Sequence, residues 1–260
     1  EYYWRGVEAD PKNAKQLGNY ANFLCDQRKD YVRAEEYYQR SVEAGPQNAT
    51  QLGNYAVFLE EQQKDYDKAE EYYRRAVEAD PKHANNLGNY ADFLWKQRKD
   101  YDKAEEYYRR AVKANPKDAT NLGNYAVFLK NQRKDYDKAE EYYRRAVEAD
   151  PKHANNLGNY ANFLYDQRKD YDRAEEYYRR AVDADSNHAN HLGNYANFLC
   201  DQRKDYDKAE EYYRRTVEAD PKDANHLGNY AIFLKNQRKD YDKAEEYYRR
   251  ALQKIGRAHV

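Results

Sequence analysis

Apolar residues recur along the chain at helical spacing, in two stripes separated by a short polar stretch. Residues 87–94 carry apolar side chains at i, i+3, i+4 and i+7, which places them on one face of a helix. A second stripe runs over residues 101–112, after the polar Arg98-Lys99-Asp100. The pattern predicts two helices joined by a turn. The two stripes consist of Leu87, Tyr90, Ala91 and Leu94, and of Tyr101, Ala104, Tyr108, Ala111 and Val112.

Short motifs predict where these helices begin. Pro81 follows Asp80, and proline is favoured at the first helical position because it lacks an N–H group. We therefore expect the first helix to start at Pro81. Asp102 and Glu105 stand at capping-box spacing, so we expect them to cap the second helix.

The helix pair recurs seven times with a fixed period. The tetrapeptide Leu-Gly-Asn-Tyr occurs at intervals of 35 residues, starting at Leu17, Leu52, Leu87, Leu122, Leu157, Leu192 and Leu227. Such a period predicts a linear array of stacked helix pairs rather than one or two globular domains. We divide residues 11–254 into repeats 1 to 7, which start at positions 11, 46, 81, 116, 151, 186 and 221.

Both ends of the sequence depart from full repeats. Residues 1–10 closely match Glu71–Asp80, so we expect a partial repeat that holds only a second helix. The final hexapeptide, from Ile255 to Val260, resembles a translated sequencing adapter. We therefore expect residues 255–260 to be a non-native tail on a gene fragment, to be set aside when the fold is considered.

Composition shows how such a polar chain can form an array. The 260 residues include 46 basic and 47 acidic side chains, and Tyr alone contributes 31. Glu105–Arg109 and Glu106–Arg110 are i, i+4 pairs, each worth about 0.2–0.5 kcal/mol in a helix. We interpret the charges as a solvated, salt-bridged face rather than a binding patch. The balanced charge disfavours a nucleic-acid partner, and no apolar run is long enough to span a membrane.

These features together resemble the tetratricopeptide repeat, whose first helix carries Trp-x2-Leu-Gly-x2-Tyr and whose second carries Ala-x3-Phe before a Pro. The matching residues here are Leu87, Tyr90, Ala91, Leu94, Ala104, Tyr108 and Pro116. The resemblance implies an all-α fold, an α-solenoid of seven tandem helix-turn-helix repeats that form a right-handed superhelix. The family period is 34, so we place the extra residue between Leu94 and Ala104, in the turn between the helices.

In the resembled family the first helices line a concave groove that binds ligands. By this resemblance, the groove residues of repeat 1 are Lys15, Gly18, Asn19, Asn22, Cys25 and Asp26. The positions of Asn22 and Cys25 vary strongly between the seven copies, which favours divergence for ligand recognition; drift at unpacked positions is the alternative. The candidate peptide-binding residues at these two positions are Asn22, Asp92, Asn162, Asn197, Trp95, Lys130, Tyr165 and Lys235.

One groove position holds the same amide in every copy. This row consists of Asn19, Asn54, Asn89, Asn124, Asn159, Asn194 and Asn229. An amide side chain can donate to a carbonyl and accept from an N–H at once, so the row could hold a peptide backbone. The alternative is that each Asn bonds to the neighbouring helix and only sets the stacking. We also expect Gly18 and its equivalents to leave the groove floor open.

Nothing in the sequence indicates catalysis or a bound cofactor. No nucleophile–base motif or Gly-rich phosphate loop occurs, so we expect no enzyme, no cofactor and no metal site. His188 and His191 stand at i, i+3, and His226 follows one period later, but no clear third ligand accompanies them. Cys25 and Cys200 lie five repeats apart and are expected to be free thiols, which favours a reducing, cytoplasmic setting.

These observations predict a protein–protein interaction scaffold that binds an extended peptide or a partner helix in the groove. Two alternatives stay open. One is an RNA-processing or RNA-binding helical-repeat scaffold, and the other is an architectural rod that self-associates end to end. The expected partner is a protein or peptide, with no membrane association.

Overall fold

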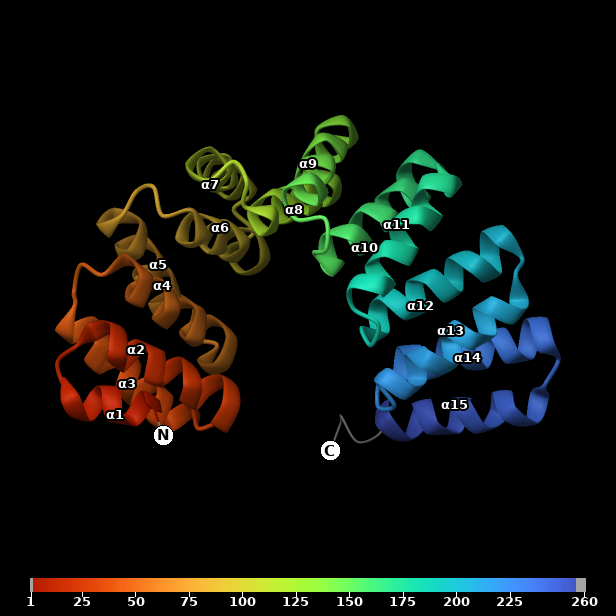
Figure 1. The fold of residues 1–260 in the computed structure, drawn as a ribbon, viewed down its shortest axis with the longest axis horizontal. Helices are drawn as coiled ribbons and strands as arrows, with labels where there is room; N and C mark the ends of the chain where they lie inside the picture. The colour runs from red at the N-terminus through yellow and green to blue at the C-terminus, as the bar shows by residue number, and fades with distance from the viewer. Residues whose placement is uncertain (1, 256–260) are drawn as a thin grey trace. The chain divides into compact units, whose positions relative to one another are not determined.

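The computed structural model describes residues 2–255, with side chains from Gly6 to Gln253. Within this range every regular element is helical and the helices follow one another in tandem, which confirms the predicted all-α solenoid (Figure 1). Glu1 and residues 256–260, which include most of the expected non-native tail, lie outside the described residues. None of the described helices combines the length and the apolar character that a membrane crossing requires.

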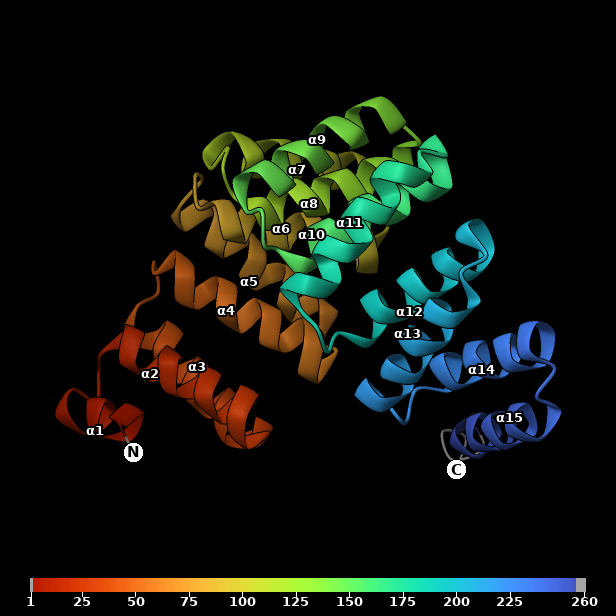
Figure 2. The ribbon, with the colours of Figure 1, turned by 45° about the vertical axis from the view of Figure 1, so that its right-hand side comes forward.

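The chain divides into two compact units after Asp135. The N-terminal unit holds α1 (Tyr2–Ala9), α2 (Ala14–Phe23), α3 (Tyr31–Ala44), α4 (Ala49–Phe58), α5 (Tyr66–Ala79), α6 (Ala84–Phe93), α7 (Tyr101–Ala114) and α8 (Ala119–Phe128). The C-terminal unit holds α9 (Tyr136–Ala149), α10 (Ala154–Phe163), α11 (Tyr171–Ala184), α12 (Ala189–Phe198), α13 (Tyr206–Ala219), α14 (Ala224–Phe233) and α15 (Tyr241–Ile255). Even-numbered helices are the first helices of the repeats and odd-numbered ones the second, and within each unit consecutive helices pack together (Figure 2).

The first helices that follow a proline begin later than that proline predicts. In repeat 3 the Asp80 carbonyl accepts the N–H of His83 at 3.2 Å, and the Asp80 side chain accepts that of Lys82 at 2.9 Å. Pro81 is therefore the second residue of a β-turn, a position that its fixed φ also suits. The N-cap of α6 is His83, whose Nδ1 accepts the Asn86 N–H at 3.4 Å. The expected start at Pro81 is wrong.

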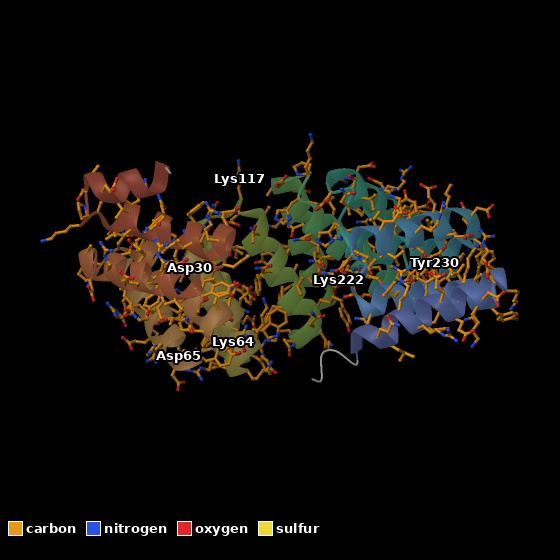
Figure 3. All side chains as sticks on the ribbon, turned by 90° about the horizontal axis from the view of Figure 1, so that it is seen from below. Asp30, Lys64, Asp65, Lys117, Lys222 and Tyr230 are labelled. Carbon is orange, nitrogen blue, oxygen red and sulfur yellow. The ribbon has the colours of Figure 1, made fainter. Side chains whose placement is uncertain are left out.

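Each first helix ends in a five-residue π-helical turn. In repeat 2 this turn is Leu59–Gln63, and Lys64 follows in the left-handed conformation with a φ of 57° (Figure 3). The N–H groups of Lys64 and Asp65 both donate to the Leu59 carbonyl, the second at 3.1 Å. A π-helical turn closes one residue later than an α-helical turn. It therefore accommodates the extra residue of the 35-residue period in the interval expected from the sequence.

The second helix of repeat 3, α7, is capped by the residue that precedes it. The Asp100 carboxylate accepts the N–H of Lys103 at 3.2 Å and binds the Lys103 ammonium at 2.9 Å. The expected cap by Asp102 and Glu105 is wrong. Both of those carboxylates bind Arg133 of repeat 4, at 2.6 and 2.7 Å.

This arginine joins successive repeats, and the arrangement recurs. Arg133 also donates to the Tyr101 carbonyl at 3.2 Å, so one guanidinium ties the end of a first helix to the start of the preceding second helix. We call this contact the arginine clamp. At the junction of repeats 1 and 2, Gln63 and the exposed Val32 stand where the clamp has Arg and Asp. The clamp is formed by Arg98, Arg133, Arg168, Arg203 and Arg238.

Tyrosine rings fill the space between repeats. Tyr73 of α5 stacks on Tyr90 of α6 with ring centroids 5.7 Å apart, and the C-terminal unit repeats the contact, for example between Tyr213 and Tyr230 at 5.9 Å. Tyrosine buries a large ring while its hydroxyl reaches a polar partner at the edge of the core. Tyrosine thus contributes large rings to the core of this polar chain, beside buried Leu, Ala, Val and Phe side chains.

Candidate functional site

The candidate site is the face of the first helices that carries the asparagine row. In repeat 1, Asn19, Asn22 and Asp26 share a hollow of about 270 Å³ with Phe23 and Gln27. The structure thus brings together three of the six positions that the resemblance assigns to a groove. We call this surface, with its equivalents in the other repeats, the first-helix face.

The row asparagines make little use of their hydrogen-bonding groups inside the protein. Asn124 donates to Asp92 at 3.3 Å. Between residues 6 and 253, the side chains of the other six row asparagines make no hydrogen bond. All seven are at least partly exposed to solvent. Bonding to a neighbouring helix therefore does not account for this amide in six of the seven repeats.

A different set of polar side chains fills the stacking role. Gln51, Asn86 and Asn121 are buried and project from α4, α6 and α8 against a glycine of the preceding first helix. A Cβ added to Gly53 would lie 2.1 Å from Asn86 Oδ1, and Asn86 Nδ2 donates to the Ala49 carbonyl at 2.8 Å. The expectation that Gly18 and its equivalents open the groove floor is wrong at Gly18, Gly53 and Gly88, because each of these admits a side chain of the next repeat. At Gly228 an added Cβ would meet no atom within 4 Å.

His191 takes the same place in the C-terminal unit. Its imidazole lies against Gly158, and its Nε2 is 3.1 Å from Asn155 Oδ1. Burial, followed by the charge of His188, lowers the pKa of His191 to about 4. The rings of His188 and His191 stack with centroids 3.9 Å apart. His191 is therefore a packing residue between repeats 5 and 6.

Among the described residues, the one group with the spacing of a metal site is Asp220, Asp223 and His226. Both carboxylates already accept hydrogen bonds from nearby backbone N–H groups. Asp220 accepts the N–H of Lys222 at 3.1 Å, and Asp223 accepts that of His226 at 2.9 Å. These are the bonds of a turn and a helix cap, which other repeats make as well.

Four of the predicted peptide-binding residues also accept hydrogen bonds from buried tyrosines. Asn22, Asn162 and Asn197 each accept the hydroxyl of a buried tyrosine, Tyr38, Tyr178 and Tyr213, at 2.6, 2.7 and 2.6 Å. Asp92 accepts the hydroxyl of Tyr108 in the same way. Burial raises the pKa of these tyrosines, which are therefore donors at neutral pH.

In repeat 2 a different residue accepts the hydrogen bond of the buried tyrosine, which the sequence pattern did not predict. Val57 replaces the acceptor, and the hydroxyl of Tyr73 donates instead to Glu60, one helical turn further on, at 2.7 Å. The paired change of Val57 and Glu60 is visible between copies. Part of the variation on this face is therefore structural.

The predicted aromatic anchors pack on the following repeat. Trp95 and Tyr165 meet Phe128 and Phe198 edge to face, both with centroids 5.7 Å apart, and the Tyr165 hydroxyl accepts from Gln202 at 3.3 Å. Both rings keep part of their surface exposed. They can contact a ligand only with the surface that this packing leaves.

The two predicted lysines are less engaged. Neither Lys130, which is partly buried, nor Lys235, which is exposed, has a carboxylate within 4.0 Å in the described part of the chain. Both ammonium groups are therefore available to a ligand.

Many charges on the second helices are paired, either within the helix or with a clamp arginine. A hollow of about 390 Å³ on α7 is lined by Asp102, Glu105, Arg109 and Arg133 among others. Glu105 binds both arginines, at 2.5 and 2.7 Å. This surface matches the sequence interpretation of a solvated, salt-bridged face, and it offers a ligand few free charges.

Comparison with known families identifies the repeat. Models of the tetratricopeptide repeat match residues 52–119, 118–187, 167–228 and 200–258, and a model of the Sel1 repeat matches residues 23–46. No curated protein matches the chain in sequence.

Solved structures share the fold at low sequence identity. One, from a functional characterization of Pseudomonas aeruginosa pilF, is 21% identical with a TM-score of 0.69, covering 86% of this chain and 97% of that one. A chain of the APC/C hetero-tetramer Cut9-Hcn1 is 17% identical with a TM-score of 0.75, covering 89% and 45%. YrrB, described as a TPR protein with an unusual peptide-binding site, is 22% identical with a TM-score of 0.50, covering 74% and 96%.

Proposed function

Because the chain belongs to the tetratricopeptide-repeat family, we propose that it is an interaction scaffold whose first-helix face holds an extended segment of a protein partner. One observation carries the proposal. The same asparagine stands at this face in all seven repeats, yet six of the seven side chains bond to nothing within the described residues. Internal packing gives no reason to keep an amide there, whereas an external ligand does.

The chemistry of the amide favours an extended segment over a helix. A carboxamide donates and accepts, which matches the alternating N–H and C=O groups of a peptide backbone. An extended segment leaves those groups free, while a helix uses them internally. A row of one amide per repeat therefore suits the backbone of an extended partner and leaves selectivity to the neighbouring positions.

The charge of the face weighs against the RNA alternative. Asp26 and Glu61 are exposed on it, and the whole chain carries a formal charge of −1. A phosphate backbone needs clustered cations. The other alternative is that the chain is an architectural rod, in which case the asparagines would have no ligand.

A peptide-display selection on the full chain tests the proposal. We expect peptides that enrich on the parent but not on a variant with Asn19→Ala, Asn54→Ala and Asn89→Ala. The matched control carries Glu36→Ala, Glu71→Ala and Glu106→Ala, which lie in the same three repeats on exposed second-helix positions. Circular dichroism confirms folding of all three proteins.

The outcomes separate the candidate functions. Equal enrichment on the asparagine variant and the parent would rule out the asparagine row as the binding element. No enrichment on a folded parent would favour the rod or the RNA scaffold. Enrichment that is lost on the glutamate variant but kept on the asparagine variant would place binding on the second helices instead.

A further inference from the structure

Charge changes sign along the first-helix face of the N-terminal unit. At the two positions equivalent to Cys25 and Asp26, the charged residues are Asp26 in repeat 1, Glu60 and Glu61 in repeat 2, Lys96 in repeat 3 and Lys130 in repeat 4. We call Asp26, Glu61, Lys96 and Lys130 the charged strip. It runs from acidic to basic in chain order, beside the row of asparagines.

The acidic end of the strip lacks counterions. Asp26 and Glu61 are exposed, and no basic side chain lies within 4.0 Å of either in the described residues. Second-helix carboxylates behave differently, since Glu70 lies 2.7 Å from Arg98 and Glu105 lies 2.7 Å from Arg133. The strip thus holds carboxylates that can still accept a cation, in a protein that pairs many of its others internally.

Glu60 adds another carboxylate to this acidic end. Its two oxygens accept the Tyr73 hydroxyl at 2.7 Å and the Gln97 amide at 3.3 Å, which fixes the carboxylate beside Glu61. Burial, with a smaller contribution from Glu61, raises the pKa of Glu60. A partner cation over Glu61 would relieve the repulsion between these two neighbours.

The basic end of the strip also holds a charge that has no counterion among the described residues. Lys96 binds Asp92 at 2.9 Å, so its charge is largely satisfied. Lys130 has no carboxylate within 4.0 Å in the described part of the chain. Lys130 is therefore the cation of the strip that remains available to an acidic partner group.

The C-terminal unit shows the same order by itself. Asp166 and Asp201 occupy the position of Asp26 and are exposed, and Lys235 occupies the position of Lys130 and is exposed. None of the three forms an ion pair with another described residue. Two units with the same order of sign argue against random drift of these positions.

We propose that each unit selects an extended protein segment that places Lys or Arg over its acidic repeats and Asp or Glu over its basic repeat. In the N-terminal unit the cation lies by Asp26 and Glu61 and the anion by Lys130. The proposal rests on the proposed function, because the asparagine row holds the backbone while the strip reads the side chains. It specifies the chemistry of the partner, a segment with separated basic and acidic residues, and disfavours a uniform polyanion.

Selection of random peptides on charge-reversal variants tests this. The parent should enrich peptides in which basic residues lie toward one end and acidic residues toward the other. Reversal of the acidic end by Asp26→Lys and Glu61→Lys should remove the basic preference. A representative parent-selected peptide should bind this variant about ten-fold more weakly, the effect of two reversed surface charges, and less so at high salt.

A matched control carries the same change of net charge on the other face. Glu36→Lys and Glu71→Lys alter the same two repeats at exposed second-helix positions and should leave both the selected pattern and the affinity unchanged. Lys130→Glu should remove the acidic preference only. Circular dichroism confirms that each variant is folded.

The results distinguish the two proposals. Enriched peptides whose charges do not respond to the strip variants, while still requiring the asparagine row, overturn the charge preference and leave the proposed function intact. If the parent enriches no peptides, both the charge preference and the proposed function are wrong. Salt-sensitive binding of a fluorescent oligouridine to the parent, stronger than that of the peptides, would also overturn the charge preference.

Discussion

At the residue scale, the chain shows how one packing position tolerates different polar side chains. His191 stands where repeats 3, 4 and 5 have Asn86, Asn121 and Asn156, and all four side chains are buried. Asparagine is neutral at every accessible pH, whereas a buried imidazole resists protonation. The substitution therefore introduces an acid sensitivity that the junctions with a buried asparagine lack.

We predict that His191 makes the chain less stable as the pH falls. Its pKa in the folded state is about 4, below the value of 6.5 for an unperturbed histidine. Between these values the unfolded chain binds a proton that the folded chain does not, so the free energy of unfolding decreases as pH falls through this window. The loss from this group approaches about 3 kcal/mol at pH 4. Urea denaturation at steps from neutral pH to pH 4 measures it.

His191→Asn is the matched control, because asparagine is what repeats 3, 4 and 5 carry at this position. All other titrating groups, including the nearby His188 and Asp185, are common to both proteins. The difference between their stabilities should therefore widen in favour of the asparagine variant as the pH falls. Parallel pH profiles would show that the imidazole is protonated in the folded protein without penalty.

A second prediction at this scale concerns the buried tyrosine hydroxyls. Asn197→Val removes the acceptor of Tyr213 and should lower the free energy of unfolding by about 1–3 kcal/mol. Adding Cys200→Glu copies the arrangement of Val57 and Glu60 in repeat 2 and should recover part of that loss. Urea denaturation of the two single variants and the double variant gives the coupling. Additive losses would mean that Glu60 does not replace the asparagine as acceptor.

At the element scale, the arginine clamp joins the end of each first helix to the second helix before it. One guanidinium binds two carboxylates and a carbonyl, which fixes the separation of two helices that belong to different repeats. The first junction lacks the clamp, with Gln63 donating to Glu35 at 3.1 Å and Val32 82% exposed.

We predict that Val32→Asp with Gln63→Arg installs a sixth clamp. The pair should raise the free energy of unfolding by about 1 kcal/mol, at the upper end for partly exposed ion pairs, and the gain should shrink in high salt. Each single substitution provides the control. A double-mutant cycle with no coupling between the two positions would show that the clamp does not hold the repeats together.

The helices could be predicted from the sequence, but some of their ends and contacts could not. Apolar spacing was sufficient to find each helix pair, because the core positions recur at helical intervals. It misplaced the start at Pro81, since proline suits the second position of a β-turn as well as the first turn of a helix. Asp102 and Glu105 had capping spacing, but their partner, Arg133, lies one repeat away. Spacing within a helix cannot reveal that contact.

The candidate site was predictable in outline only. Variation between copies pointed to the first-helix face, and Asn19, Asn22 and Asp26 do share a hollow there. It could not show that Asn22 also serves Tyr38, because that bond joins two helices of one repeat. The stacking residues, such as Asn86, were missed because their only signal is a glycine one repeat earlier.

At the scale of the whole molecule, stability should be the sum of repeats and the junctions between them. The sequence offers a direct test, because Asp65–Ala91 and Asp135–Ala161 are identical. Removing residues 81–150 joins Asp80 to Pro151 and creates no local sequence that the chain does not already contain. The shortened protein loses two repeats and keeps every remaining repeat in register.

We predict that this deletion variant folds with unchanged helicity per residue in circular dichroism. The slope of its unfolding free energy against urea should fall by about a quarter, in proportion to the surface lost, since each repeat contacts only its neighbours. Removing residues 81–133 instead joins Asp80 to Lys134, which places a turn residue directly after a second helix, and should abolish cooperative unfolding of the following repeats. If the in-register deletion also loses helicity per residue, then contacts beyond nearest neighbours stabilise the array, and the arginine clamps and tyrosine stacks are insufficient to hold it.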